Sequence, residues 1–367
     1  MDDALAVAVR EGVCEVARDG LTELFLTLPG ATADQLPALA RALCEERGAA
    51  IVRAEITGPV NDPAAEAGAE SLAGELGAPV TWLLGGTYSR GAMGGLHLHA
   101  VTGAEVTPLQ LEGHLVGTAI RGRYATELFV GGLDSARPAA PRPVQARDTF
   151  ERMEEVLALV DMDFSHVVRT WLFLDDILSW YGEFNRVRTT FFRERGVFDR
   201  LVPASTGIGG TNPAGTAMLT GLYAVQPLDP TVVVQALPSP LQCPALQYGS
   251  SFSRAAEADM PDLRRLLVSG TASIAPGGET VHVGDIDGQV ARTCEVVEAI
   301  LHSREMTWED VTRAIVYVRH GADAGAFERF RQASGMPALP ALVAHNVICR
   351  DDLLFEIEVD AVSGCSR

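Results

Sequence analysis

The chain of 367 residues is 47% hydrophobic and carries a formal net charge of −19 at pH 7. That is enough apolar content to fill two or three packed modules. Its acidic balance argues against nucleic acid or an anionic membrane as a partner, because both require a basic surface that displaces counterions. No run of about 18 apolar residues predicts a membrane span, and the start Met1-Asp2-Asp3 lacks the basic region of a signal peptide. We therefore expect a cytoplasmic protein.

The cysteine and histidine patterns give no metal site. None of the cysteines forms a CxxC pair or a close Cys/His spacing, which favours a reducing compartment and excludes a typical zinc site. They are Cys14, Cys44, Cys243, Cys294, Cys349 and Cys365. His97 and His99 lie two apart, on one face of an expected strand, without a third ligand nearby. The glycine-rich stretch 207–210 lacks the lysine of a phosphate loop, so we expect no cofactor.

The first 110 residues read as a βαβ-like segment. Leu24, Leu26 and Leu28 share one face of an expected strand, a helix is predicted over 33–46, and a second strand over 50–56. Two interpretations stay open here: a degenerate copy of the unit that follows, or a cap of different fold.

The rest of the chain contains one pattern twice, 144 positions apart. Gln145 matches Gln289 and Arg169 matches Arg313, with no gap between these positions. Two fused copies of one α+β unit, over 111–230 and 231–367, therefore build most of the protein. The predicted elements are helix 144–160, strand 167–174, helix 180–195 and strand 217–225 in the first copy, and strand 266–268, helix 287–303, strand 314–318, helix 326–333 and strands 342–348 and 353–359 in the second. Stretches 134–143 and 227–244, rich in Pro and Gly, are predicted to be loops.

Three motifs of the second copy resemble the reactive-intermediate deaminase (Rid) fold, a chorismate-mutase-like unit that normally forms trimers. They are Phe252-Ser253-Arg254-Ala255, Ser269-Gly270-Thr271-Ala272 and Phe355-Glu356-Ile357-Glu358. Over roughly 115–367, the chain is more similar to the chorismatases, which fuse Rid-like units and remove the enolpyruvyl side chain of chorismate. The resemblance implies tandem Rid-like units in a pseudo-trimeric arrangement, a monomer, and an active site for chorismate between units.

Glu356 is the expected catalytic residue. Strand periodicity alone places it on a solvent-facing side together with Glu358. The resemblance implies instead that the first glutamate of this pair points into the pocket between units. There a carboxyl with a raised pKa could deliver a proton to the enolpyruvyl methylene carbon as a general acid.

Cys349, the second expected catalytic residue, precedes Glu356 by seven residues. A lone cysteine is usually a small buried hydrophobic residue. The resemblance implies the chorismatase branch that makes 3-hydroxybenzoate, since the branch that hydrolyses the ether to 2,3-dihydro-dihydroxybenzoate carries a different residue there.

Chorismate carries two carboxylates, so its site needs cations and hydrogen-bond donors. The resemblance implies Arg254 as the leading carboxylate clamp. Gly270 and Thr271 are expected in a turn that offers backbone N–H groups and a hydroxyl. Tyr124 and Tyr223 are candidate donors, or simply core aromatics.

Two other functions remain as alternatives. Rid deaminases bind the substrate carboxylate through an arginine after a Pro-Ala pair, but this chain reads Pro340-Ala341-Leu342 and Pro203-Ala204-Ser205. The missing arginine puts enamine or imine hydrolysis in doubt. A noncatalytic metabolite-binding module would lack a pocket acid, so Glu356 counts against it.

Overall fold

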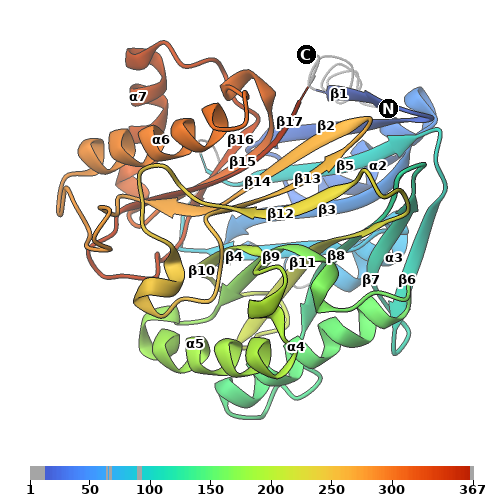
Figure 1. The fold of residues 1–367 in the computed structure, drawn as a ribbon, viewed down its shortest axis with the longest axis horizontal. Helices are drawn as coiled ribbons and strands as arrows, with labels where there is room; N and C mark the ends of the chain where they lie inside the picture. Colours follow the sequence, from blue (N-terminus) through green and yellow to red (C-terminus); the bar gives the residue numbers. More distant parts are fainter. Residues whose placement is uncertain (1–12, 63–64, 66–67, 89–92, 364–367) are drawn as a thin grey trace.

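The computed structural model describes residues 13–62, 65, 68–88 and 93–363. Three β-sheets face one another around a shared centre, and pairs of helices cover their outer faces (Figure 1). Met1-Asp2-Asp3 and Cys365 lie outside the described residues.

The first sheet contains five strands in the order β1-β2-β5-β3-β4. Helices α2 (Leu36–Arg47) and α3 (Ala69–Leu76) cover it, and a 3-10 turn (Ala33–Gln35) precedes α2. The strands are β1 (Val13–Arg18), β2 (Leu21–Pro29), β3 (Ala50–Pro59), β4 (Val80–Gly85) and β5 (Gly95–Thr102). The strands and helix predicted between residues 24 and 56 are thus confirmed.

The second and third sheets contain six strands each. The second unit comprises β6 (Val106–Leu111), β7 (His114–Arg121), β8 (Ala125–Asp134), α4 (Arg142–Ala158), β9 (Val167–Leu174), α5 (Ile177–Glu194), β10 (Ala204–Gly209) and β11 (Met218–Pro227). The third comprises β12 (Val233–Leu237), β13 (Ala255–Met260), β14 (Leu263–Ala272), α6 (Ile286–His302), β15 (Val311–Val318), α7 (Ala326–Ser334), β16 (Ala341–His345) and β17 (Phe355–Val362).

All three sheets share one topology. The second runs β6-β7-β8-β11-β9-β10 and the third β12-β13-β14-β17-β15-β16, while the first has the same order without the outermost strand. Each has one parallel pair at the same place, β3 with β4, β9 with β10 and β15 with β16. This order favours the interpretation of the first 110 residues as a third copy. Since β6 pairs with β7, the second sheet begins at Val106, ahead of the predicted boundary at 111.

Two segments that were predicted to be a turn and a loop contain β-strands. The prediction of a turn at Ser269-Gly270-Thr271 was wrong, because β14 continues to Ala272 and keeps pairing with β17 beyond an irregularity between Val268 and Thr271. The predicted loop 227–244 contains β12, which pairs with β13. The prolines that flank β12 end the strand without preventing it.

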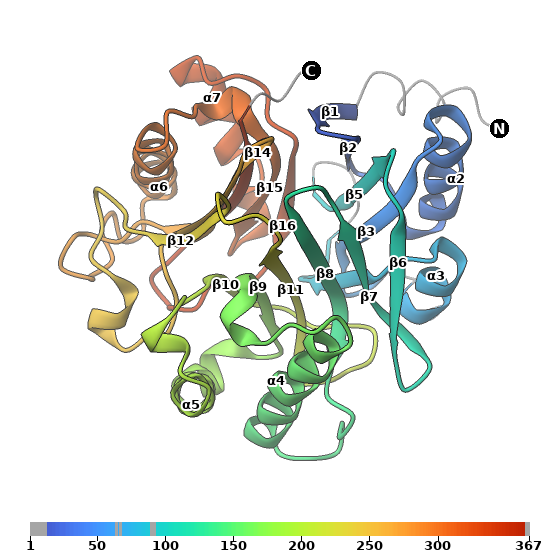
Figure 2. The ribbon, with the colours of Figure 1, turned by 45° about the vertical axis from the view of Figure 1, so that its right-hand side comes forward.

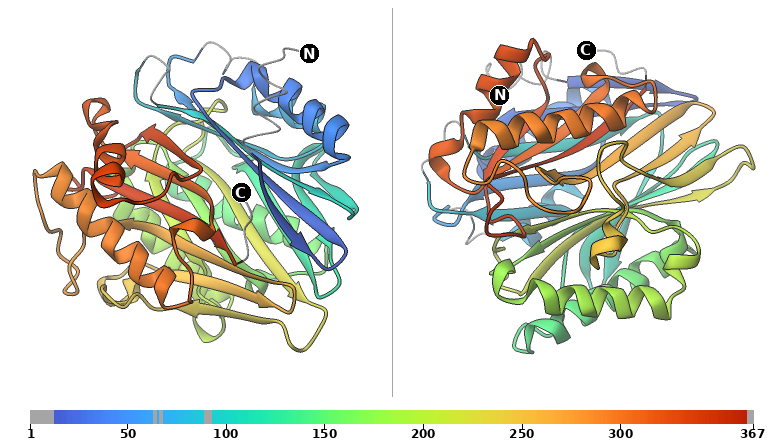
Figure 3. Two further views of the ribbon diagram at one scale, coloured as in Figure 1. Left: turned by 90° about the horizontal axis from the view of Figure 1, so that it is seen from above. Right: turned by 60° about the vertical axis from the view of Figure 1, so that its left-hand side comes forward.

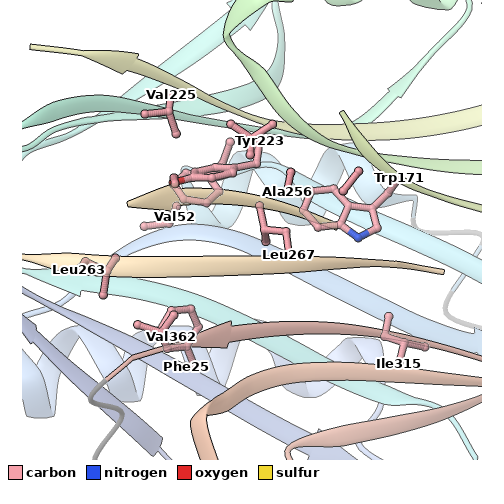
Figure 4. Close-up of a cluster of buried hydrophobic side chains, with 14 of the residues drawn as sticks. Phe25, Val52, Trp171, Tyr223, Val225, Ala256, Leu263, Leu267, Ile315 and Val362 are labelled. Atoms are coloured by element: carbon pink, nitrogen blue, oxygen red, sulfur yellow. The ribbon is translucent and has the colours of Figure 1, made fainter. Parts of the chain in front are cut away.

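The inner faces of the sheets form one hydrophobic core. Figure 4 shows Phe25 from the first sheet, Trp171 and Tyr223 from the second, and Leu267 and Ile315 from the third around this core. A separate buried cluster lies between each sheet and its helices, and Figure 2 shows these helices on the outer side of the sheets. In α6 the predicted stripe is buried, and each fully buried aliphatic side chain contributes about 1.5–3 kcal/mol.

One arginine from each unit reaches the centre of the molecule. Arg53, Arg169 and Arg313 occupy equivalent register positions on β3, β9 and β15. Their guanidinium carbons lie 4.6, 5.2 and 5.4 Å from the ring centroid of Trp171. Glu358, which is fully buried, accepts hydrogen bonds from Arg169 at 3.1 Å and from Arg313 at 2.7 Å. The face of β17 expected to meet solvent therefore lies between units.

The histidines on β5 are structural. His99 Nε2 lies 2.8 Å from Glu23 Oε2, and His97 Nε2 lies 3.2 Å from the carbonyl oxygen of Ala314. The described residues contain no group of three side chains suited to hold a metal ion. Among the described cysteines, Cys44, Cys243, Cys294 and Cys349 are free, whereas Cys14 is disulfide-bonded. Disulfides are rare in reducing compartments, so this bond does not support the predicted reducing environment.

Within the described part of the chain, no helix is long and apolar enough to cross a membrane.

Candidate active site

A cavity of about 640 Å³ lies between the second and third units. Helix α5 and strand β10 form one wall, and the segment before β13 together with β14 and β17 forms the other. In the right-hand view of Figure 3, the yellow-green helix α5 lies below the yellow to red strands of the third sheet. Residues used below are Tyr181, Asn185, Arg188 and Gly207 from the second unit and Phe252, Arg254, Gly270, Cys349 and Glu356 from the third.

Glu356 lies in the cavity wall on β17 and is only 4% exposed. Burial, and then the nearby charge of Glu358, raise the pKa of Glu356 to about 8, although Arg169 and Arg254 oppose this shift. The carboxyl is therefore largely protonated at neutral pH. A protonated acid in an otherwise cationic cavity can donate a proton to a bound anion.

Gly270 makes room for this carboxyl. A Cβ atom at position 270 would clash with Glu356 Oε1, so a side chain cannot be added without moving the acid. The N–H of Gly270 donates to Thr206 Oγ1 of β10 at 3.0 Å. That N–H is thus engaged across the interface between the two units and is not the free ligand donor expected from the sequence.

The cavity is strongly cationic although the chain is acidic. Five arginines line it, and Glu356 is the one carboxyl among the described lining residues. The arginines are Arg186, Arg188, Arg193, Arg254 and Arg350. Such a lining favours a ligand with more than one negative charge.

Two of these arginines, one from each unit, lie beside the ring of Phe252. Arg254 is 5% exposed, its Nε donates to the Cys243 carbonyl at 2.9 Å, and its guanidinium carbon lies 5.6 Å from the ring centroid. Arg188 is 2% exposed, donates to Asn185 Oδ1 at 2.6 Å, and lies 5.9 Å from the same centroid. Both guanidinium groups are held in position before a ligand arrives, which lowers the entropic cost of binding.

Cys349 lies in the same cavity as a neutral thiol. Burial, and then the charge of Glu356, raise its pKa to about 12, while Arg350 and the hydroxyl of Tyr181 act in the opposite direction. Burial also raises the pKa of Tyr181, which therefore remains a neutral hydrogen-bond donor. Neither group is ionised near neutral pH, so the geometry gives no thiolate nucleophile.

Three predicted binding residues do not line this cavity. Tyr124 donates to Asp19 Oδ2 at 2.7 Å near the surface, and Tyr223 is buried in the central core, where it donates to Glu127 Oε2 at 2.6 Å. Thr271 is also buried, and its hydroxyl donates to the Ser269 carbonyl at 2.7 Å. These side chains lie outside the cavity because its second wall comes from α5 and β10 rather than from β8 and β11.

The contribution of α5 to the cavity was not predicted from the sequence. Tyr181, Asn185 and Arg188 all reach the cavity from this helix. A signal was present, since four arginines fall within 186–195 of a chain that is acidic overall.

Comparison with known proteins gives relatives of one kind, although no protein-family model matches the chain. A chorismatase of Streptomyces rapamycinicus is 29% identical over 222 residues, which cover 54% of this chain and 64% of the relative. A 3-hydroxybenzoate synthase of Streptomyces hygroscopicus is 30% identical over 237 residues, which cover 57% and 65%. The chain is similar in sequence to chorismatases over more than half of its length.

The resemblance to the chorismatases is thereby confirmed, although the matches span just under two thirds of the length of these curated relatives. A solved chorismatase structure, at 1.08 Å resolution, superposes with a TM-score of 0.62 and 20% identity over 95% of this chain and 99% of that one. The predicted α+β fold of fused units, shared with a chorismatase, is confirmed along almost the whole chain.

Proposed function

We propose that this relative of the chorismatases removes the enolpyruvyl group of chorismate to give 3-hydroxybenzoate and pyruvate, with Glu356 as the general acid. One observation carries the proposal: a buried carboxyl with a pKa of about 8 lies in a cavity that is otherwise lined by arginines. Arg254 and Arg188 would bind the two carboxylates of the substrate from opposite units.

The first step is proton transfer from Glu356 to the methylene carbon of the enolpyruvyl group. The vinyl ether becomes an oxocarbenium ion, and the new carboxylate of Glu356 stabilises this cation. The bond between ring carbon 3 and the oxygen of the pyruvate unit then breaks as the oxygen of the neighbouring hydroxyl on ring carbon 4 bonds to carbon 3. This oxygen next leaves carbon 4, the ring loses the hydrogen of carbon 3 on becoming aromatic, and Glu356 regains its proton. Together, 3-hydroxybenzoate and pyruvate contain the same atoms as chorismate, so this outcome consumes no water.

Cys349 would shape the product rather than attack the substrate. Its neutral thiol occupies space beside Glu356, where a water molecule would otherwise be able to enter. The relative named 3-hydroxybenzoate synthase supports this outcome. The alternative is hydrolysis of the ether to 2,3-dihydro-dihydroxybenzoate, which adds one water.

Incubation of the protein with chorismate, without metal or nucleotide, tests the proposal when the products are separated by chromatography. Pyruvate and 3-hydroxybenzoate are expected in equal amounts. The dihydrodiol would assign the protein to hydrolysis, and 4-hydroxybenzoate to a lyase-like elimination. Absence of chorismate turnover, with turnover of 2-iminopropionate, would favour the deaminase alternative.

We also propose that the chain works as a monomer in the cytoplasm, without a nucleic acid or membrane partner. Three units in one chain supply the surfaces that separate subunits would otherwise provide. Light scattering that gives the mass of an obligate trimer would contradict the monomer.

A further inference from the structure

A second cavity, of about 580 Å³, lies between the first and second units. We call it the second cleft. Its walls come from α3 and β4 of the first unit and from β7, β8 and β11 of the second. These elements are the counterparts of α5, β10, β13, β14 and β17, which form the candidate active site.

Strand register fixes the correspondence residue by residue. Leu219 pairs with Asp134 in the second unit where Glu356 pairs with Ala272 in the third. The contact between units is also repeated: Gly132 N–H donates to Thr81 Oγ1 at 3.1 Å, as Gly270 N–H does to Thr206 Oγ1. The second cleft is thus the same inter-unit site one unit earlier in the chain.

The residues assigned to chorismate chemistry are absent from the second cleft. By register, Leu219 replaces Glu356, Val116 replaces Arg254, and Trp82 replaces Gly207. The second cleft therefore lacks both the acid and the clamp of the first. An apolar wall takes their place.

The second cleft carries charged residues at positions where the candidate active site has none. Asp134 stands where the third unit has Ala272, and accepts a hydrogen bond from Thr216 Oγ1 at 3.2 Å. Arg152, 9% exposed, reaches the second cleft from α4, and its Nη1 donates to Glu112 Oε2 at 2.7 Å.

Two buried donors in these walls have no acceptor among the described residues. They are Nε of Arg152 and Nε1 of Trp82, and both residues line the second cleft. A buried donor without an acceptor costs about 1–3 kcal/mol. Trp82 is 0% exposed, so its ring belongs to the apolar wall, whereas the guanidinium group of Arg152, which is 9% exposed, is the cation of the cleft. Carboxylates also outnumber cations here, with Glu70, Glu112 and Asp134 against Arg152.

We propose that the second cleft is a binding site for a small zwitterion with an apolar side chain, that is, an amino acid. Its ammonium group would bind Asp134 and Glu112, and its carboxylate would accept hydrogen bonds from the guanidinium group of Arg152. The apolar side chain would pack on the wall that contains Leu219.

The third interface shows that such a cavity is not an automatic result of the fold. At the position equivalent to Glu356, the first unit has Gly95, and the side chain of Leu342 packs directly against it. A side chain thus fills that interface, whereas the second cleft is an open cavity whose charged residues differ from those of the candidate active site.

Isothermal titration calorimetry of the full chain, with each of the twenty amino acids up to roughly 10 mM, tests the site at the affinities of weak metabolite sites. We expect an apolar amino acid such as phenylalanine to bind once per chain. Phenethylamine and 3-phenylpropionate, which each lack one charge, should bind at least about 10-fold more weakly. Asp134→Asn and Arg152→Leu should each weaken binding by about 10-fold or more.

Two further variants separate this site from the candidate active site and from misfolding. Ala214 is exposed at the second cleft, so Ala214→Trp should block it without disturbing the core. Glu356→Gln should leave amino-acid binding unchanged. Failure of all twenty amino acids to bind, or binding that Glu356→Gln abolishes and Ala214→Trp does not affect, would overturn the proposal. Neither result depends on chorismate turnover, so it is independent of the proposed function.

Discussion

Glu356 differs from an ordinary strand glutamate in two ways: it is buried between units, and its nearest charges include another carboxylate, Glu358. Periodicity predicted the face of the strand on which it lies, but not what covers that face. The covering layer comes from another unit, and no local pattern reports a contact so distant along the chain.

Glu356→Gln should lower kcat for chorismate by roughly 100-fold or more, since a glutamine keeps the shape but cannot donate a comparable proton. The KM should change little. Steady-state kinetics with pyruvate detection measures both. Glu279→Gln is the matched control, because Glu279 is exposed and does not line the cavity. A Glu356→Gln variant with near-normal kcat would remove this residue from the mechanism.

The pKa of about 8 predicts how activity depends on pH. A general acid works in its protonated form, so kcat/KM should fall as pH rises above about 8, and Glu356→Gln should lack this fall. A rate profile that is flat from pH 6 to about 10 would contradict the assignment.

The same pKa predicts an effect on stability. The folded pKa is raised above 4.5, so the stability that proton binding to Glu356 provides is complete below pH 4.5 and is lost as pH rises through about 8. Urea titrations should show that the free energy of unfolding of Glu356→Gln, relative to the natural protein, increases across this interval. A constant difference would mean that Glu356 is ionised throughout.

At the scale of elements, helix α5 contributes side chains of the second unit to the wall of the candidate active site. The sequence located this helix to within three residues at its start, because its apolar stripe is regular. It did not reveal that Tyr181 and Arg188 line the same cavity as Glu356, since the repeat aligns the units with each other but does not say which of their faces touch. Strand β12 was missed for a related reason, because Pro- and Gly-rich flanks dominate its short segment.

Arg188→Ala on α5 and Arg254→Ala beside β13 should both raise the KM for chorismate, by about 10-fold or more, with a smaller change in kcat. Each loses a carboxylate partner that is present in the ground state and the transition state alike. Arg41→Ala, which removes an exposed arginine of α2, is the control. An effect of Arg254→Ala alone would mean that α5 only closes the cavity.

At the scale of the whole molecule, the repeat correctly predicted fused α+β units, but only two of the three similar sheets. The first sheet shares the topology without a detectable residue match, because a core needs only apolar residues of suitable size at its inward positions. What the units do share in sequence is the central arginine position, as Arg169 and Arg313 show.

Glu358→Gln should destabilise the whole protein. Strand spacing makes Glu358 look like a harmless neighbour of Glu356, yet it is fully buried and accepts hydrogen bonds from Arg169 and Arg313. Removing one partner of a buried ion pair lowers the free energy of unfolding by about 3–5 kcal/mol. The Tm of Glu358→Gln should therefore lie below that of the natural protein. Glu309→Gln, at an exposed glutamate, should leave the Tm unchanged. An unchanged Tm in both variants would show that the central charges contribute no net stability.

The two walls of the candidate active site belong to one covalent chain. A catalytic centre assembled from separate subunits falls apart when the enzyme is diluted, because its formation follows mass action. Here the walls cannot diffuse away from each other. The specific activity per mole of chain should therefore stay constant down to the lowest enzyme concentration at which product can be detected.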